Sequence, residues 1–457
     1  MPWHLAEGQT WMSAASTCCP RQMVDKAKEM NRRDFLKLAA ISGGALPLGF
    51  EVLAQNERAA DPHKFILSAP LTHSDWMLKP GVAWGEAGVH HMLDRCKEAG
   101  WSRIYWRAFD GGRSLYRSKL LRPQGMWDDD SFWNPQSDED RKLQQRFTMG
   151  MTPEKRTALR DQLYALDYAH FDSLAAAVTY GHKIGLEIHA WVSINEDDHG
   201  WGLQSEFSQK HPKFRWRRRD GRVYRSQLSF AFPAVRRYKL ALLKELLRYD
   251  LDGFFFDWIR TGDVRDNPQT DTEGVADNGY EAPLVKSFKK KFGIDPHDIK
   301  NSDERWVRAR AEPQTEFMRA ACQLIRAKRR KLPIAAMVGH PWHYRGEQNK
   351  IDGNLRGLLL DVTTWAREGL VDSVVAAGYY RDGGNAELAW QALRKETEGK
   401  VDVWTYAWVP TSVADAEQTF ALADRVGARQ ILFWEADYID DRPNAAELKA
   451  HMRNRAE

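Results

Sequence analysis

The chain alternates between two patterns of apolar residues. Short runs that are apolar on both faces are separated by longer segments in which apolar residues recur every three or four positions. The short runs are typical of strands in a parallel sheet that helices cover, and the longer spacing is typical of amphipathic helices. The pattern predicts eight strands, at 65–71, 103–110, 186–195, 253–257, 334–340, 371–380, 401–409 and 429–438.

Helices are predicted between nearly all of these strands, at 85–100, 170–185, 233–249, 315–331, 355–369, 386–398, 412–427 and 445–452. Right-handed crossovers between neighbouring parallel strands close such a chain into a (β/α)8 TIM barrel. We therefore expect an α/β fold with residues 55–457 as a single barrel domain. Two long insertions, at 111–167 and about 261–302, follow strands two and four, on the side where substrate-shaping loops lie.

Residues 1–54 are expected to be an export signal and not part of the fold. The run NRRDFLK at 31–37 resembles a twin-arginine signal, and an apolar run and a cleavage site at 52–54 follow it. We expect translation to start at Met23 or Met30, so that residues 1–22 are not translated. The apolar run is shorter than the ~20 residues of a transmembrane helix, and no Cys follows the cleavage site. We therefore expect export by the twin-arginine translocation machinery to the periplasm or the medium, with no stable membrane anchor after cleavage.

Composition excludes some partners and favours others. The net charge of +4 is too balanced to indicate nucleic-acid binding. Nineteen Trp residues are many for this length, and their faces are suited to stacking on sugar rings, although core packing also uses them. Cys96 and Cys322 each lie in a helical pattern and are expected to be small buried residues.

The stretch RYDLDGFFFDWIR at 248–260 carries the clearest functional signal. A helix ends, Asp252 and Gly253 make a tight connection, and an aromatic strand then finishes on Asp257. Barrel enzymes place their chemistry at the C-terminal ends of their strands. Asp257 is therefore our first catalytic candidate, and the alternative is an Asp that only caps the next turn.

Carboxylates and aromatic residues dominate the other strand ends as well, and glycoside hydrolysis needs these residue types. One carboxylic acid protonates the leaving oxygen, and a second carboxylate attacks the anomeric carbon or activates water. There are two candidates for the second carboxylate, Glu435 and Glu196. Glu435 is spaced by two from Ile431 and Phe433 and shares their face, which we take as the barrel interior. Glu196 is on the adjacent third strand. Glu435 is favoured, and a salt bridge to an arginine is the alternative for each.

Ten further strand-end residues are predicted to contact substrate. They are Asp110, Trp191, Asn195, Arg260, His340, Trp342, Tyr379, Trp404, Trp408 and Trp434. Arg260 would also keep Asp257 ionised. The chain has no HExxH or HxH metal signature, no phosphate-binding Gly loop and no Ser-His-Asp spacing, so we expect neither a metal nor another cofactor.

The segment from His189 to Arg260 resembles the bacterial glycosyl-hydrolase-like family 10 group of (β/α)8 proteins. The matching pieces are HAWVSIN, HPKFRWRRRDGR and FPAVRRYKLALLKELLRYDLDGFFFDWIR. The resemblance implies a glycosidase-type barrel that acts on cell-wall or extracellular polysaccharide, with Asp257 as the carboxylate of strand four. The chain departs from the family pattern at Ser193–Glu196 and Ile259–Gly262, near the expected site mouth, so the substrate does not carry over.

Three functions remain open from the sequence. The leading hypothesis is an exported glycoside hydrolase that acts on a polysaccharide or oligosaccharide. The second is a carbohydrate-binding barrel without turnover, which would keep the aromatic platforms but lack paired carboxylates. The third is a metal-dependent sugar isomerase or deacetylase, which would gather His189 or His340 with carboxylates around one ion.

Overall fold

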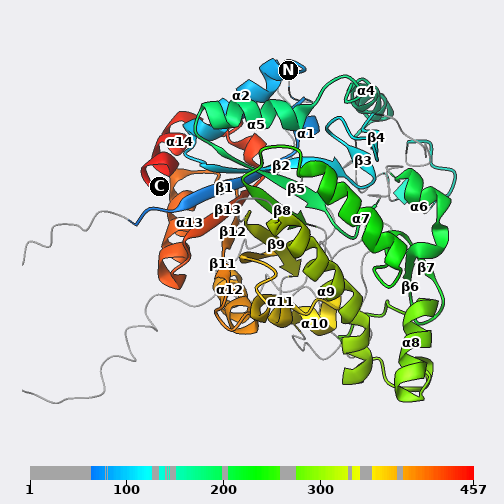
Figure 1. Ribbon diagram of the computed structural model, residues 1–457. Helices are drawn as coiled ribbons and strands as arrows, with labels where there is room; N and C mark the ends of the chain where they lie inside the picture. Colours follow the sequence, from blue (N-terminus) through cyan, green and yellow to red (C-terminus); the bar gives the residue numbers. More distant parts are fainter. Residues whose placement is uncertain are drawn as a thin grey trace, which may run out of the picture. The chain divides into compact units, whose positions relative to one another are not determined.

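Eight parallel strands close into a ring at the centre of the protein (Figure 1). The computed structural model describes residues 63–457, except 78, 80, 126–132, 139–140, 143, 145–150, 198–203, 258–273, 328–331, 340–352 and 378–383. The predicted export signal lies outside the described residues. The ring strands are β1 (Ile66–Leu71), β2 (Arg103–Asp110), β5 (Glu187–Ser193), β8 (Gly253–Asp257), β9 (Ile334–Gly339), β10 (Ser373–Ala377), β11 with β12 (Asp402–Val403 and Thr405–Trp408) and β13 (Gln430–Trp434).

The eight predicted strands and the (β/α)8 fold are confirmed. Each strand pairs in parallel with its neighbours along the chain, and β13 pairs with β1 to complete the ring. The seventh strand is interrupted once, at Trp404, so that β11 pairs with β10 and β12 pairs with β13. The backbone N–H of Trp404 still donates to the carbonyl of Val374 at 3.0 Å, which carries the hydrogen bonding across the interruption.

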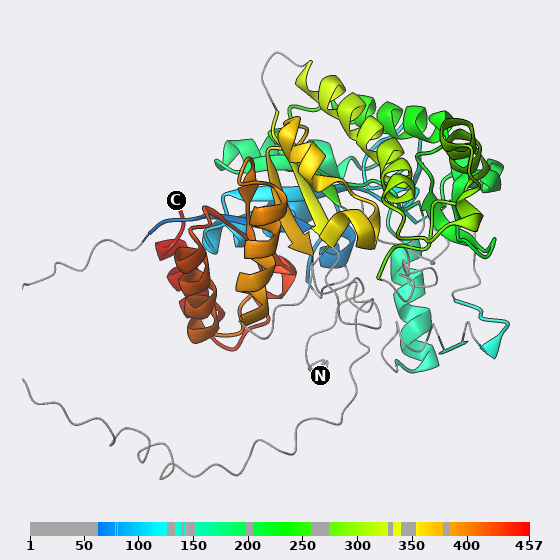
Figure 2. The ribbon, with the colours of Figure 1, turned by 90° about the horizontal axis from the view of Figure 1, so that it is seen from below.

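Helices surround the ring. They are α2 (Glu86–Glu98), α5 (Ser173–Lys183), α7 (Pro233–Leu246), α9 (Glu304–Arg326), α10 (Gly353–Leu358), α11 (Val362–Arg367), α12 (Gly384–Glu396), α13 (Val413–Val426) and α14 (Ala445–Asn454). Figures 1 and 2 show α13 and α14 on one side of the strands and α7 and α9 on the opposite side. None of the described helices is long and apolar enough to cross a bilayer.

Two predicted helices differ from the observed ones. Helix α9 begins at Glu304, well before the predicted start at 315, because Asp303 caps its first turn and the buried face continues through Trp306 and past Pro313. The predicted helix at 355–369 is divided into α10 and α11, because Leu359 adopts a left-handed backbone with φ of 57°.

Shorter elements occupy the segments between several ring strands and the helices that follow them. The segment after β1 holds α1 (His73–Met77), and the insertion after β2 holds β3 (Arg113–Ser114), β4 (Arg122–Pro123) and α4 (Pro153–Tyr164). The segment after β5 forms a hairpin that the sequence did not predict. Its elements are α6 (Glu206–Lys210), η3 (Pro212–Phe214), β6 (Arg215–Arg217) and β7 (Val223–Leu228). The insertion after β8 holds α8 (Ala282–Phe292) and η4 (Pro296–Asp298), and η5 (Ala436–Tyr438) follows β13.

The core has an outer and an inner layer. The outer layer packs strand residues such as Ile104 and Phe433 against the helices, and it also buries Cys96 and Cys322, as predicted. The inner layer lies inside the ring and is partly polar: the Gln430 amide donates to the hydroxyl of Tyr105 at 2.7 Å. This arrangement leaves the inward-facing residues at the C-terminal ends of the strands available for a site.

Gly253 shows how tightly the start of β8 fits the barrel. A Cβ at this position would lie 2.3 Å from Nδ1 of His189, so a larger residue would force the two strands apart. His189 is 3% exposed, and its Nε2 lies 3.2 Å from Glu187 Oε2 at the start of β5. His189 is thus a packing residue at the N-terminal end of the barrel, away from the strand ends considered below.

Candidate active site

Asp257 ends strand β8 and faces into the barrel. Its side chain is on the same face of the strand as Phe255, whose ring lies 4.6 Å from the ring of Tyr105 inside the barrel. The carboxylate is fully buried, and Nε1 of Trp191 donates a hydrogen bond of 2.9 Å to its Oδ2. The pairing of β5 with β8 sets Ser193 opposite Asp257 and brings this donor within reach. Asp257 lies where the sequence predicts it, and its catalytic role stays a prediction.

Arg107 on β2 connects Trp191 to a second carboxylate. Its guanidinium carbon lies 4.4 Å from the centre of the Trp191 ring, and its Nη2 donates to Asp110 Oδ1 at 2.5 Å and to Ser193 Oγ at 3.1 Å. Arg107 has no exposed surface, and a buried cation over an indole ring contributes about 2 kcal/mol of attraction. The arginine therefore fixes both the Trp191 ring and the Asp110 carboxylate.

The predicted aromatic residues occupy two depths of the barrel. Trp434 lies 5.5 Å from Trp191 in an edge-on arrangement, near the strand ends. Trp404 stacks on Tyr105 at 5.7 Å, one layer deeper, and is 6% exposed. Trp408 lies at the end of β12 and is half-buried. Trp434 is itself only 9% exposed, so Trp408 has the most accessible surface of the three rings.

Acidic side chains gather where β13, β1 and β2 end. Asp75 in α1 follows β1, Asp110 ends β2, and Glu435 and Asp437 follow β13. Burial, together with the negative charges of Asp437 and Asp110, raises the pKa of Asp75 to about 7. Burial and the same kind of repulsion, from Asp437 and Asp75, hold the pKa of Glu435 well above its usual value. A carboxylic acid with a raised pKa keeps its proton near neutral pH, as a general acid requires.

Lys79 limits the charge of this acidic group. Its Nζ lies 2.7 Å from Asp441 Oδ2 and 3.6 Å from Asp437 Oδ2. Lys79 also lies over the ring of Tyr438, 4.5 Å from its centre. The lysine partly neutralises the Asp437 side of the group, and the pKa of Asp437 is nevertheless raised by burial.

The face assigned to Glu435 from the sequence is wrong. Ile431 and Phe433, taken as interior residues, belong to the outer core, and Phe433 contacts Phe420 on α13 at 6.4 Å. The interior face of β13 instead carries Trp434. Glu435 has φ of 64°, a left-handed backbone that breaks the alternation, so its direction does not follow from period two. Its electrostatic coupling to Asp75 and Asp437, and not the alternation, groups it with the mouth.

Glu196 lies in a different environment. It has no exposed surface, and the Nζ of Lys239 on α7 donates to its carbonyl oxygen at 3.2 Å and to Asp197 Oδ1 at 3.4 Å. Asp197 Oδ2 also accepts from the backbone N–H of Ser205 at 3.2 Å. Glu196 is thus part of a buried polar network beneath α7, which favours Glu435 as the partner of Asp257.

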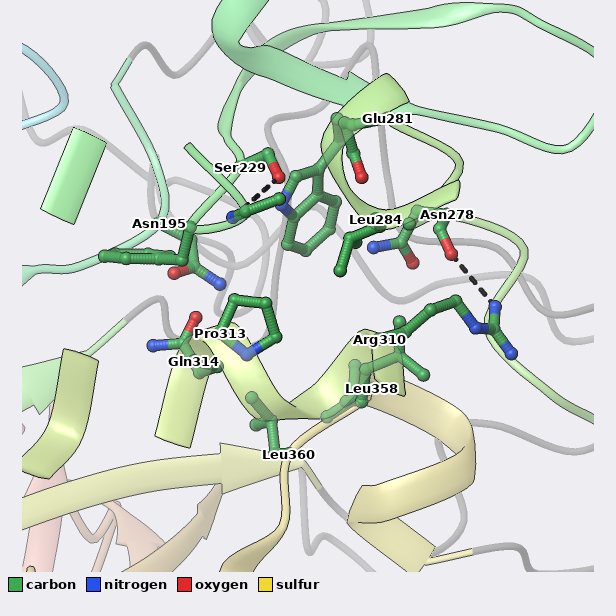
Figure 3. A pocket seen from close by; sticks show the side chains of 15 residues that line it. Asn195, Ser229, Asn278, Glu281, Leu284, Arg310, Pro313, Gln314, Leu358 and Leu360 are labelled. Atoms are coloured by element: carbon green, nitrogen blue, oxygen red, sulfur yellow. Dashed lines mark hydrogen bonds between the residues drawn. The ribbon is translucent and has the colours of Figure 1, made fainter. Parts of the chain in front are cut away.

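The remaining predicted residues divide into two groups. Asn195 lines a cavity beside the barrel mouth, which Figure 3 shows from close by. Arg260, His340, Trp342 and Tyr379 lie outside the described residues. Within the described ranges, no group of three or more His, Cys, Asp or Glu side chains has the geometry of a metal site.

Sequence reasoning missed two residues at the mouth and one exposed tryptophan in the segment after β1. Asp75 stands four residues after β1, so the rule applied to the other strand ends would have found it. Arg107 is an arginine within a strand that is otherwise buried, which is itself a signal of a functional or ionic contact. Trp84 follows in the same β1–α2 segment; the residue is 39% exposed, and its ring lies 5.3 Å from that of His73. An exposed indole of this kind is suited to stacking on a sugar ring.

Solved glycosidase barrels have the same architecture. The catalytic domain of β-amylase from Paenibacillus polymyxa superposes with a TM-score of 0.54 at 9% identity, covering 86% of this chain and 100% of that one. The β-galactosidase from the psychrophilic Marinomonas ef1 superposes with a TM-score of 0.51 at 11% identity, covering 85% of this chain and 58% of that one. At these identities the likeness shows the TIM-barrel fold alone.

The sequence comparison is more specific. A search of curated proteins found no match. The family model described as glycosyl hydrolase-like 10 matches residues 162–408, which include β5, β8 and Asp257 and more than half of the chain. The chain therefore belongs to the glycosyl hydrolase-like 10 family.

Proposed function

We propose that this protein is a glycoside hydrolase whose catalytic centre lies at the C-terminal mouth of the barrel. The observation that carries the proposal is the contrast between two carboxyl groups. Asp257 accepts a hydrogen bond from the Trp191 indole, whereas burial and neighbouring carboxylates raise the pKa of Glu435 well above its usual value. Two carboxyl groups in such different environments are suited to the separate roles of acid and base or nucleophile. Family membership and the glycosidase-type barrel support the same reaction class.

In this mechanism Glu435 gives its proton to the glycosidic oxygen as the bond to the anomeric carbon breaks. Asp257 either attacks the anomeric carbon or removes a proton from the water that attacks it. Trp434 and Trp84 supply aromatic surfaces for the sugar rings, and Arg107 holds the Trp191 donor in place. When Asp75 is ionised, its negative charge favours the protonated form of Glu435 before the reaction.

Variants of Glu435 and Glu196 test which of the two residues is the general acid. We expect Glu435→Gln to lower turnover by about 10²–10⁴-fold, the usual contribution of a general acid. Glu196→Gln should change turnover by less than about threefold, because Glu196 is buried beside Lys239. Steady-state rates on the same substrate decide between them, and the reverse order of effects would assign the acid to Glu196.

Export is part of the proposal. The twin-arginine run at 31–37 and the apolar segment after it support translocation to the periplasm or the medium, where polysaccharide substrates are found. A folded (β/α)8 barrel is compatible with this route.

A carbohydrate-binding barrel without turnover is the second candidate. It is supported by the complete burial of Asp257 and by its hydrogen bond to Trp191, because a purely structural strand-end carboxylate has the same features. The family description, hydrolase-like, agrees with either function.

One screen tests the proposal. Purified protein is incubated with a panel of bacterial and algal polysaccharides, and new reducing ends and calorimetric binding are measured in parallel. The hydrolase predicts new reducing ends from at least one polymer that also binds. Binding without any bond cleavage would contradict the hydrolase and favour the binding barrel.

A further inference from the structure

Trp84 lies in the connection between β1 and α2 and is the largest exposed apolar side chain among the described residues. Its neighbours are the rings of His73, from the same connection, and of Tyr168 and Phe171, from the connection between β2 and α5. In a (β/α)8 barrel, the connections from each strand to the next helix build the C-terminal face. Trp84 therefore lies on the face of the barrel where the strands end.

The ring contacts of Trp84 are edge-on or tilted, and none of them is stacked. The Trp84 ring lies 5.1 Å from that of Tyr168 with 75° between the planes, and 5.5 Å from that of Phe171 with 60° between the planes. The ring of His73 is 5.3 Å away, at 57°. Within the part of the chain that the structure describes, no ring thus lies parallel to the indole, and 39% of the residue is exposed. An exposed indole face is suited to the apolar CH groups on one side of a pyranose ring.

The backbone on the two sides of Trp84 differs in packing. A Cβ on Gly85, the next residue, would have no described atom within 4 Å, so the space beside it is open. A Cβ on Gly88, in the first turn of α2, would instead lie 2.1 Å from the carbonyl oxygen of Ala83. Helix α2 is therefore in close contact with the residue that precedes Trp84. This contact holds the indole in place, and the open side leaves room for a ligand.

The rings that support Trp84 are buried and carry no charge. Nδ1 of His73 lies 2.8 Å from the hydroxyl oxygen of Tyr168, and both residues are at most 1% exposed. Burial lowers the pKa of His73 to about 3, so its imidazole is neutral at neutral pH. The ring of His73 is also 5.9 Å from that of Trp106 on β2. The cluster is thus fixed to the β1–β2 side of the barrel, and its rings supply no charge that would bind an ionic group.

Asp257 lies on a different side of the ring of strands. In the order of the sheet, β2 and β5 separate β1 from β8, the strand that ends at Asp257. Neighbouring strands are about 4.8 Å apart, so three such spacings amount to ~14 Å along the ring, which is longer than one sugar unit. A single sugar bound at Asp257 would not reach Trp84, whereas a chain of sugars that crosses the mouth would.

We propose that Trp84 forms a separate sugar subsite, which stacks on a neutral pyranose unit remote from the bond that is cleaved at Asp257. The inference rests on the proposed function and adds a substrate class to it, namely a polymer or a long oligosaccharide and not a disaccharide. The CH groups of one face of the sugar contact the indole, and the hydroxyl groups at the edge of the sugar stay in water. Binding of this remote unit helps to hold the chain across the mouth.

The test measures how affinity depends on the length of the sugar chain. Asp257→Asn protein, which is expected to bind without turnover, is titrated calorimetrically with cello-, malto-, xylo- and chito-oligosaccharides, from disaccharides to octasaccharides. In at least one series, affinity should rise with length, and adding Trp84→Leu should weaken binding of the long members about 3–10-fold while leaving the disaccharide unchanged. No binding in any series, no loss in the Trp84→Leu protein, or an equal loss at every length would overturn the proposal.

Matched variants assign the effect to the flat face of the indole. Trp84→Leu keeps an apolar side chain against Tyr168 and Phe171 but has no flat face, whereas Trp84→Phe keeps one and should retain most of the affinity for long chains. Leu388→Ala removes an apolar side chain that is 49% exposed on α12, and it should bind like the parent at every length. Trp84→Met provides a second variant without a flat face if Trp84→Leu does not fold. Equal losses in Trp84→Leu and Leu388→Ala would contradict the proposal.

Hydrolysis by the protein with Asp257 intact separates this inference from the proposed function. Length-dependent binding that Trp84→Leu weakens, without any bond cleavage by the unaltered protein, would contradict the proposed function and leave the subsite intact. Where a polymer is cleaved, Trp84→Leu should raise KM for the polymer about 3–10-fold and leave kcat within about twofold. An unchanged KM would contradict the subsite and leave the hydrolase intact.

Discussion

At the scale of single residues, the candidate site is a chain of contacts that begins at Asp257. Trp191 donates to the Asp257 carboxylate, Arg107 lies over the Trp191 ring, and Asp110 accepts from Arg107. Each member fixes the next, so that the buried carboxylate is held in one orientation. Preorganised donors of this kind are effective in catalysis because they need no rearrangement during the reaction.

Replacing the Trp191 donor tests this chain. Trp191→Phe keeps an aromatic ring but removes the hydrogen bond to Asp257, and we expect turnover to fall about tenfold or more and stability to fall by about 1–3 kcal/mol. The control is Trp365→Phe, because the buried indole of Trp365 donates to Thr315 Oγ1 at 3.0 Å among the outer helices. The control should lose stability alone. Urea denaturation and steady-state rates separate the two effects, and equal turnover in both variants would contradict a role for Trp191.

The raised pKa of Asp75 predicts how the stability of the protein depends on pH. Its pKa in the folded protein, about 7, lies above the ~4 of an unfolded chain, so the folded state holds the proton more tightly. Stability should therefore fall as pH rises from about 4 to 7, and Asp75→Asn should reduce that fall by on the order of 1–2 kcal/mol after allowance for solvent screening. Urea denaturation at pH 4, 6 and 8 measures it. Identical slopes for the two proteins would show that Asp75 titrates normally.

The sequence predicted some of these residues and missed others for identifiable reasons. Asp257 was found because its strand is regular and its end is a fixed point of the fold. Glu435 was placed on the wrong face because period two fails at a left-handed backbone, which a sequence does not reveal for a non-glycine residue. Arg107 was missed because two of its contacts, Trp191 and Ser193, come from the neighbouring strand β5 and are not visible in the sequence of β2.

At the scale of elements, the segment after β5 determines which carboxylates reach the mouth. Lys239 on α7 extends under this segment and contacts Glu196 and Asp197, and all three are buried. Burial lowers the pKa of Lys239, and the charges of Asp197 and Glu196 partly offset this effect. The network anchors the start of the β6–β7 region to the barrel.

Removing the positive charge of Lys239 should strongly lower the stability of the protein. Lys239→Met leaves the Asp197 carboxylate buried without its ion pair, and we expect a loss of about 3–5 kcal/mol. Adding Asp197→Asn should recover part of the loss, because the buried charge is then absent. Chemical denaturation of the single and double variants measures both effects. A single variant within about 1 kcal/mol of the parent would show that the pair contributes little.

The elements that the sequence predicted least well are those that build the cavity lined by Asn195. The β6–β7 hairpin is short and its pattern is dominated by arginines, so period two was not visible. The start of α9 was missed because its buried face runs across Pro313. Both depend on contacts with distant segments, which override local preference.

At the scale of the whole molecule, the eight strands were predictable because each is buried on both faces and each ends near a helix start. Closure of the ring was a consequence of their number and order, and the β13–β1 pairing shows it. The depth of each aromatic residue in the barrel was not predictable. Trp404 and Trp434 look alike in sequence and both are buried, but Trp404 packs on Tyr105 and Trp434 packs on Trp191, nearer the strand ends.

Export also belongs to the whole chain. Replacing Arg32 and Arg33 of the twin-arginine run by Lys should block translocation, because the pair is the feature that the export machinery recognises. Cell fractionation of tagged protein measures the outcome, with Arg58→Lys, after the expected cleavage site, as the control outside the run. Unchanged export of the double variant would exclude the twin-arginine route.

The central claim is that Asp257 takes part directly in breaking a glycosidic bond. The measurement that tests it most directly is kcat/KM of Asp257→Asn relative to the parent, on a polysaccharide that the parent cleaves, with folding matched by circular dichroism. The account predicts a loss of at least about 10³-fold, because a charged group in the reaction is replaced by a neutral one of the same shape. The control is Asp252→Asn at the opposite end of the same strand, which should keep its turnover. Undiminished hydrolysis by Asp257→Asn would contradict the claim.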